Sequence, residues 1–324
     1  MLTEILAELP TQFADPNLLI GNDTNDDAAV YRIAGDRAIV ASTDFFMPIV
    51  DDPRTFGRIA AANAVSDIYA VGATPVFALA VAGMPINVLP PATIGQVLAG
   101  GAELCAEAGF AVAGGHSIDA PEPIYGLAVV GLADPSKIKR NDTARAGDVL
   151  ILGKGLGTGV LSAAFKKDQL DDDGYHQLVE TTTQLNKVGI DFGNMAAVHA
   201  MTDITGFGIL GHLLELCRGA KLSAKIKWAD LPILSKGKEL AKEGFNTGAA
   251  DRNWQASRDY VTLSSGIEEW QRKLLADPQT GGGLLLSVAP EAADQVLAVF
   301  LAQGFDAART IGRMEEGAPA VTVD

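Results

Sequence analysis

The sequence has few cysteines, few aromatic side chains and few basic residues. Its two cysteines, Cys105 and Cys217, each lie in an apolar helical pattern, which favours buried, reduced thiols over a disulfide or a catalytic role. The 25 Lys and Arg residues are outnumbered by 40 Asp and Glu residues, and the formal net charge is −15. Such a surface repels DNA and anionic membranes, so we expect no nucleic-acid or membrane partner.

Long apolar runs are also missing. The most apolar region, residues 76–101, is broken by Pro and Gly well short of the ~20 residues that a membrane helix needs. The first ten residues, MLTEILAELP, carry two Glu and no Lys or Arg, unlike a signal or transit peptide. We therefore expect a cytoplasmic protein. H-E-x-x-H, G-x-S-x-G and metal-binding Cys/His clusters are absent, which disfavours zinc enzymes and serine hydrolases.

Short apolar runs alternate with longer helical patterns, which indicates an α/β or α+β fold, and 324 residues suffice for two domains. A polar, basic segment at residues 134–148 reads as a linker. The predicted domains are residues 1–135 and 145–324. In the first we expect strands at residues 28–33, 37–43, 75–84, 110–115 and 124–133, with helices at 54–71 and 91–108.

The second half restarts with a predicted strand at residues 149–154. A strand, helix and strand at residues 282–314 come near its end, and residues 221–262 are the least regular part. The predicted helices of this half are residues 158–166, 173–197 and 207–218.

Acidic residues gather where predicted strands and helices begin or end. The stretch NDTNDDAAVY, residues 22–31, crowds three Asp and two Asn against a strand. Asp44 follows a strand, and Asp203 precedes a helix. Each of these positions is also explained by a turn or a helix cap. Mg²⁺, however, binds a few carboxylates together with waters and substrate phosphates. The four that could serve are Asp27, Asp44, Asp67 and Asp203.

Asp67 stands out because it lies with Asn63 near the middle of an apolar helical stripe. A carboxylate there has a desolvation cost unless a partner or a metal compensates it. The two interpretations are a metal or ligand site and a satisfied polar pair in the core.

Three glycine-rich segments follow predicted strands and are candidates for phosphate binding: AVAGGHSIDAPEP, GKGLGTGV and DPQTGGGLL. None matches a P-loop or a G-x-G-x-x-G motif, so each is a weak signal alone. His116 and Ser117, in the first segment, are possible ligand contacts, although a structural role is the commoner one for a single His.

Taken together, these strings resemble selenophosphate synthetase (selenide, water dikinase). The resemblance rests on NLLIGNDTNDDAAVY, STDFFMPIVDDPRTFGRIAAANAVSDIYAVGATP, AGGHSIDAPEPIYGLAV, MTDITGFGILGHL and DPQTGGGLLL, in order from about residue 12 to the C-terminus. It implies a two-domain α/β (α+β) fold of the ATP-binding superfamily of aminoimidazole ribonucleotide synthetase, dimerised through its N-terminal sheets. It also implies conversion of ATP, selenide and water to selenophosphate, AMP and phosphate, with Mg²⁺ and usually K⁺.

The resemblance also assigns site residues. The implied Mg²⁺ ligands are Asp27, Asp67 and Asp203. The implied ATP contacts are Thr24, Asn25, Asp26, Asp44 and Asp67, with Gly115, His116 and Ser117 lent to the neighbouring subunit's ATP.

The family carries a glycine-rich arm before the segment that begins here at Met1. That arm holds a Cys or selenocysteine and a Lys, both tied to catalysis, and this sequence contains neither motif. We therefore assign no catalytic residue, and expect either a truncated form or a variant without the arm. The alternatives to the synthetase are a catalytically impaired protein that binds Mg²⁺ and ATP, and a related small-molecule kinase.

Overall fold

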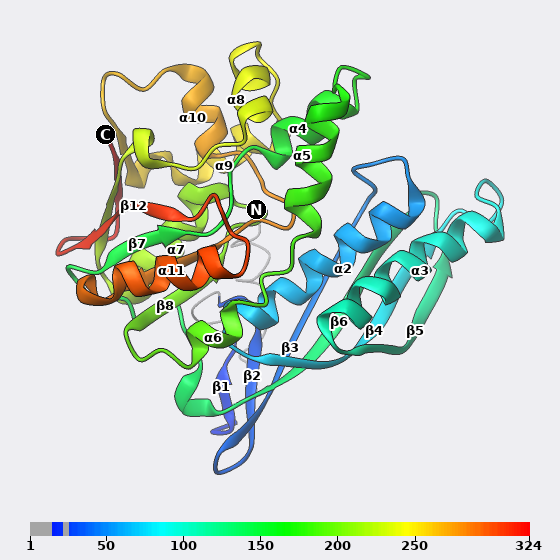
Figure 1. The fold of residues 1–324 in the computed structure, drawn as a ribbon, viewed down its shortest axis with the longest axis horizontal. Helices are drawn as coiled ribbons and strands as arrows, with labels where there is room; N and C mark the ends of the chain where they lie inside the picture. Colours follow the sequence, from blue (N-terminus) through cyan, green and yellow to red (C-terminus); the bar gives the residue numbers. More distant parts are fainter. Residues whose placement is uncertain (1–14, 22–25) are drawn as a thin grey trace.

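The computed structural model describes residues 15–21 and 26–324. These residues form two mixed sheets with helices packed against them (Figure 1). Thr24 and Asn25, two of the expected ATP contacts, lie outside the described residues. Within the described part, no helix is long and apolar enough to cross a membrane.

The first sheet contains all five strands predicted for the first half. Its order is β1-β2-β3-β6-β4-β5, and only β4 and β5 pair in parallel. The strands are β1 (Leu18–Ile20), β2 (Ala29–Ala34), β3 (Arg37–Phe46), β4 (Thr74–Met84), β5 (Ala111–Asp119) and β6 (Ile124–Ala133).

Two helices, α2 (Pro53–Ala70) and α3 (Pro91–Ala108), lie side by side across one face of this sheet (Figure 1). Glycines allow their close approach, since a Cβ on Gly57 would stand 1.9 Å from the Val97 carbonyl oxygen, and one on Gly100 2.0 Å from that of Arg54. Because α2 also contacts the second domain, it is buried on nearly every side. Its apolar stripe is therefore poorly defined in the sequence.

The second sheet has the order β10-β13-β9-β12-β7-β11-β8. In β7, Ile151 packs in the core beneath α11, whereas Leu150 and Leu152 pack in the core beneath α7, so helices cover both faces. The strands are β7 (Val149–Leu152), β8 (Val198–Asp203), β9 (Ser223–Ile226), β10 (Val261–Leu263), β11 (Leu284–Val288), β12 (Arg309–Glu315) and β13 (Val321–Val323).

Helices of this second domain are mostly short. They are α4 (Thr158–Phe165), α5 (Asp172–Thr183), α6 (Gly189–Gly193), α7 (Gly208–Ala220), α8 (Ser235–Lys242), α9 (Gly248–Ser257), α10 (Glu269–Leu275) and α11 (Ala293–Ala302). Single 3₁₀ turns are η1 (Pro135–Lys137), η2 (Trp228–Asp230), η3 (Arg258–Tyr260) and η4 (Pro290–Ala292).

One prediction for the second half was wrong. The single helix expected at residues 173–197 is two helices, because the buried Lys154 Nζ donates to the carbonyl oxygens of Thr181 (3.2 Å) and Gln184 (2.6 Å) and so ends α5. Residues 221–262, expected to be the least regular part, hold the short elements β9, η2, α8, α9, η3 and β10. These elements have 3 to 10 residues each, too few for a clear period in the sequence.

The contact between α2 and α3 gives a test of the fold. We expect Gly100→Ala to destabilise the protein by about 1–3 kcal/mol, because its methyl group would overlap the Arg54 backbone. Gly95 lies in the same helix with no atom near its Cβ position, so Gly95→Ala should stabilise by up to about 1 kcal/mol. Urea unfolding measures both, and equal effects of the two substitutions would contradict the packing described.

Candidate metal centre

Three of the predicted carboxylates converge. Asp27, Asp67 and Asp203 each offer one oxygen, and these oxygens lie within 4.8 Å of one another. Asp27 stands just before β2, Asp67 lies in the last turn of α2, and Asp203 ends β8. Two carboxylates therefore come from the N-terminal domain and one from the C-terminal domain.

The free oxygens of this cluster fit a cation. One oxygen of Asp27 and both oxygens of Asp203 are buried without a hydrogen bond of acceptable geometry from any described residue. The other Asp27 oxygen accepts the Thr202 hydroxyl at 2.8 Å, and Asp67 accepts the Ser42 hydroxyl. Buried carboxylate oxygens without donors are costly, and an all-carboxylate set suits a hard divalent cation such as Mg²⁺.

Burial and mutual repulsion hold these carboxyl groups toward their neutral forms. Burial raises the pKa of Asp27 and of Asp67 well above the ordinary value, and the charge of Asp203 adds to both shifts. Burial also raises the pKa of Asp203, opposed by the Ser66 hydroxyl and by the charges of His212 and Lys154. A divalent cation would remove this repulsion.

Asp44 lies next to the cluster on β3. Burial, and then the charge of Asp203, raise its pKa to about 6. The Asn63 amide donates to the Asp44 carboxylate, and the Asn63 carbonyl oxygen accepts the Gly281 N–H at 2.7 Å. Asn63 thus links Asp44 to the C-terminal domain, a contact that the helical stripe in the sequence did not reveal. Asp26, another predicted ATP contact, accepts the backbone N–H of Asn141 at 2.7 Å.

Asp203 does not cap a helix. The next helix, α7, begins at Gly208 after Phe207, and no side chain caps it. The Thr205 N–H instead donates to His212 Nε2 at 3.1 Å, which fixes the turn after Asp203. The capping interpretation of this stretch was wrong.

Gly115, His116 and Ser117 are not brought to the carboxylates within this chain. They lie on β5, the edge strand, which β4 and β6 separate from β3. All three are exposed. Gly115 has a φ of +153°, and a Cβ there would stand 2.1 Å from the Ala80 carbonyl oxygen, so glycine is needed for the pairing with β4.

Backbone N–H groups of the glycine-rich segment GKGLGTGV are hydrogen-bonded to side chains of the same chain. The N–H groups of Gly157 and Thr158 donate to Gln279 Oε1 at 2.9 and 3.0 Å, and that of Val160 donates to Asp277 at 3.1 Å. Burial raises the pKa of Asp277 to about 7. These N–H groups are occupied, so the phosphate-binding interpretation of this segment was wrong.

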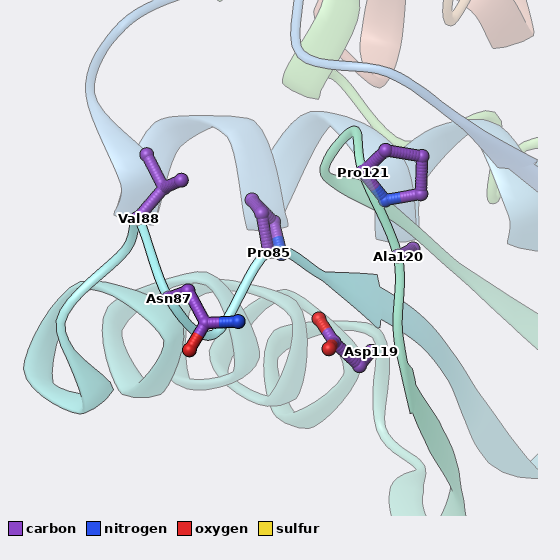
Figure 2. Close-up of a pocket in the computed structure, with 6 residues that line it drawn as sticks. All are labelled: Pro85, Asn87, Val88, Asp119, Ala120 and Pro121. Carbon is purple, nitrogen blue, oxygen red and sulfur yellow. The ribbon is translucent and has the colours of Figure 1, made fainter.

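A separate pocket of about 310 Å³ lies between the loop after β4 and the end of β5 (Figure 2). Its one carboxylate, Asp119, accepts the Ile86 N–H at 3.4 Å. None of the clustered aspartates lines it. The lining residues are Pro85, Asn87, Val88, Asp119, Ala120 and Pro121.

Two family models cover most of the chain. The AIR synthase related protein N-terminal domain matches residues 25–133, and the corresponding C-terminal domain matches residues 145–324.

Solved structures of the same fold are distant in sequence. A thiamine-monophosphate kinase from Stenotrophomonas maltophilia K279a has a TM-score of 0.67 at 19% identity, covering 95% of this chain and 92% of its own. A hydrogenase maturation protein HypE in complex with ATP has a TM-score of 0.68 at 18% identity, covering 99% of this chain and 90% of its own. The predicted fold class is confirmed.

Curated relatives are much closer. Proteins named selenide, water dikinase from Burkholderia orbicola (strain MC0-3) and Pseudomonas straminea are each 57% identical, over 100% of this chain and 91% of the relative. The one from Rhizobium meliloti (strain 1021) is 50% identical, over 100% of this chain and 93% of the relative. The resemblance seen in the motifs is confirmed, and the chain belongs to the selenide, water dikinase family of AIR synthase related proteins.

Proposed function

We propose that this chain transfers a phosphoryl group from ATP to selenide and uses water to release a second one, giving selenophosphate, AMP and phosphate. The convergence of Asp27, Asp67 and Asp203 at the junction of the two domains carries the proposal. Relatives at 57% identity with the name selenide, water dikinase support the acceptor, and they do not favour a related small-molecule kinase.

In this proposal the three carboxylates bind Mg²⁺, and K⁺ is a further cofactor. When bound, the cation supplies positive charge that neutralises phosphate oxygens. The hydroxyl groups of Ser42 and Thr202 hold Asp67 and Asp27 in place. Asp44, braced by Asn63, contacts the nucleotide, as do Asp67 and the segment Thr24, Asn25 and Asp26.

Neither cysteine of the chain is proposed to handle selenium. Cys105 and Cys217 are buried and free, as the sequence predicts. Burial raises the pKa of each thiol to about 12, so both stay protonated and unreactive at neutral pH.

The proposal includes a homodimer. The face of the first sheet opposite α2 and α3 exposes large apolar side chains, including Ile33 (51% exposed) and Phe45 (48%). The others on this face include Tyr31, Phe77, Leu79, Ile118 and Leu132. A second copy would bury this face, and Gly115, His116 and Ser117 of β5 would then reach the partner's nucleotide.

The remaining assignments follow from the same function. Residues 1–135 form the unit for nucleotide, cation and dimer contacts, and residues 145–324 supply Asp203. We propose a cytoplasmic enzyme that acts on ATP and selenide and has no nucleic-acid or membrane partner.

Phosphorus NMR tests the function directly. The chain, and a form extended at its N-terminus by a glycine-rich arm with Cys and Lys, are incubated with ATP, Mg²⁺, K⁺ and anaerobic selenide. We expect selenophosphate, AMP and phosphate at least from the extended form, and no selenophosphate after Asp67→Asn. Nucleotide binding without selenophosphate in either form would refute the assignment.

The cluster also predicts a pH dependence of stability. The folded pKa values of Asp44 (about 6), Asp27, Asp67 and Asp203 are raised, so the stability present below about pH 4 is lost as the pH rises through the folded values. We expect the metal-free Tm to fall from about pH 5 to about pH 8, and Mg²⁺ to restore it only at the higher pH. Thermal scans measure both effects.

Asp203→Asn tests whether the cluster causes this pH and Mg²⁺ dependence, since it removes one buried charge and changes the side chain little in size. Its metal-free Tm at about pH 8 should exceed that of the wild type, and Mg²⁺ should no longer raise it. Asp277 contributes to the pH slope in both proteins, so only the Mg²⁺-dependent part is diagnostic. An equal response of the two proteins to Mg²⁺ would contradict the proposed site.

Light scattering with size-exclusion chromatography tests the dimer. We expect Leu79→Glu and Leu132→Glu to give monomers, because each places a charge on the open sheet face. Leu301→Glu, at a leucine on α11 that is at least as exposed, should leave the oligomeric state unchanged. A wild-type monomer, or dimers in all three variants, would contradict this interface.

A further inference from the structure

Asn186 is a buried amide between α5 and α6 that joins the two domains. It is 1% exposed. Its Nδ2 donates to the Ser66 hydroxyl oxygen and to the Gly282 carbonyl oxygen, both at 2.8 Å. Ser66 belongs to α2 of the N-terminal domain, whereas Gly282 belongs to the C-terminal domain.

Both partners adjoin the proposed metal ligands. Ser66 immediately precedes Asp67 in α2. Gly282 leads into β11, where Leu284 pairs with Asp203, and the Gly283 carbonyl oxygen accepts the Ile204 N–H at 3.0 Å. The two bonds of Asn186 therefore set the position of the turn that carries Asp67 relative to the strand end that carries Asp203.

The segment of residues 281–283 is held rigidly enough to transmit this constraint. The Gly281 N–H donates to Asn63, and the Gly281 carbonyl oxygen accepts Lys154 Nζ at 2.7 Å. A Cβ on Gly282 would stand 1.9 Å from the Ile204 carbonyl oxygen, so the chain passes too close to β8 for any side chain. This segment therefore fixes the end of β8, which carries Asp203. Its Gly281 N–H already donates to Asn63, so it is not free to bind a phosphate.

Asn186 is also costly to keep. Its carbonyl oxygen is buried without a hydrogen-bond donor among the described residues. An unsatisfied buried acceptor destabilises a protein, and this offsets part of the stability that the two donated bonds contribute.

We propose that Asn186 is a positioning residue for the metal centre, holding Asp67 and Asp203 at the separation that one shared cation requires. The inference rests on the proposed function of the carboxylates. Groups that orient metal ligands from behind typically change metal affinity 10- to 100-fold when removed.

Mn²⁺ binding in the absence of nucleotide, followed by electron paramagnetic resonance, tests the inference on the full chain. We expect Asn186→Ala and Ser66→Ala each to weaken Mn²⁺ binding about 10-fold. The double variant should be no weaker than the weaker single variant, because both substitutions break the same tie. The metal-free Tm of Ser66→Ala should fall, because the buried Asn186 amide loses an acceptor, but the variant should stay folded at the temperature of the binding experiment.

Asn194→Ala is the matched control. Asn194 also bonds outside the C-terminal domain, accepting Lys137 Nζ of the linker at 2.9 Å, but it is bonded to none of the elements that carry the carboxylates. It should bind Mn²⁺ as the wild type does. If Asn186→Ala does not fold, Asn186→Ser takes its place, because the Ser66 hydroxyl also acts on Asp203 and Ser66→Ala cannot isolate the role of Asn186.

Mn²⁺ binding by the wild type separates a failure of the proposed metal centre from a failure of the role of Asn186. Absence of Mn²⁺ binding by the wild type would overturn both the proposed metal centre and this inference. Wild-type binding with unchanged affinity in Ser66→Ala, or additive losses in the double variant, would overturn the role of Asn186 alone.

Discussion

The structure depends on three carboxylates from two domains being held together against their own repulsion. Asp27 and Asp67 come from the N-terminal domain and Asp203 from the C-terminal domain, so the domains cannot separate without dismantling the cluster. Burial strengthens the repulsion, because little water is present to screen it. A cation and the phosphates that it binds are the natural counterpart of this arrangement.

Hydrogen bonds from neighbouring side chains oppose the repulsion between the buried carboxylates. Ser42 and Thr202 donate to them directly, while Asn63 and Asn186 tie α2 to residues 281–283. The proposed metal centre is thus contacted by amides and hydroxyls, while the charges of Lys154 and His212 act on Asp203. The carboxylates outnumber these two basic groups, which agrees with the excess of acidic residues in the chain.

Much of the architecture could be predicted from the sequence because it is local. The alternation of apolar runs gives the strands of the first sheet. The grouping of Asp27, Asp67 and Asp203 came from the family resemblance, because position alone left Asp44 among the candidates as well. What could not be predicted depends on partners far along the chain. Lys154 ends α5 from about 30 residues away, and Gln279 occupies the N–H groups of a glycine-rich loop more than 100 residues earlier.

If the three carboxylates share one cation, anomalous diffraction from crystals grown with Mn²⁺ will show it directly. We expect an anomalous peak between the side chains of Asp27, Asp67 and Asp203, with an oxygen of each in the coordination sphere. Peaks elsewhere on the molecule, with the three carboxyl groups hydrogen-bonded to one another or turned apart, would contradict it.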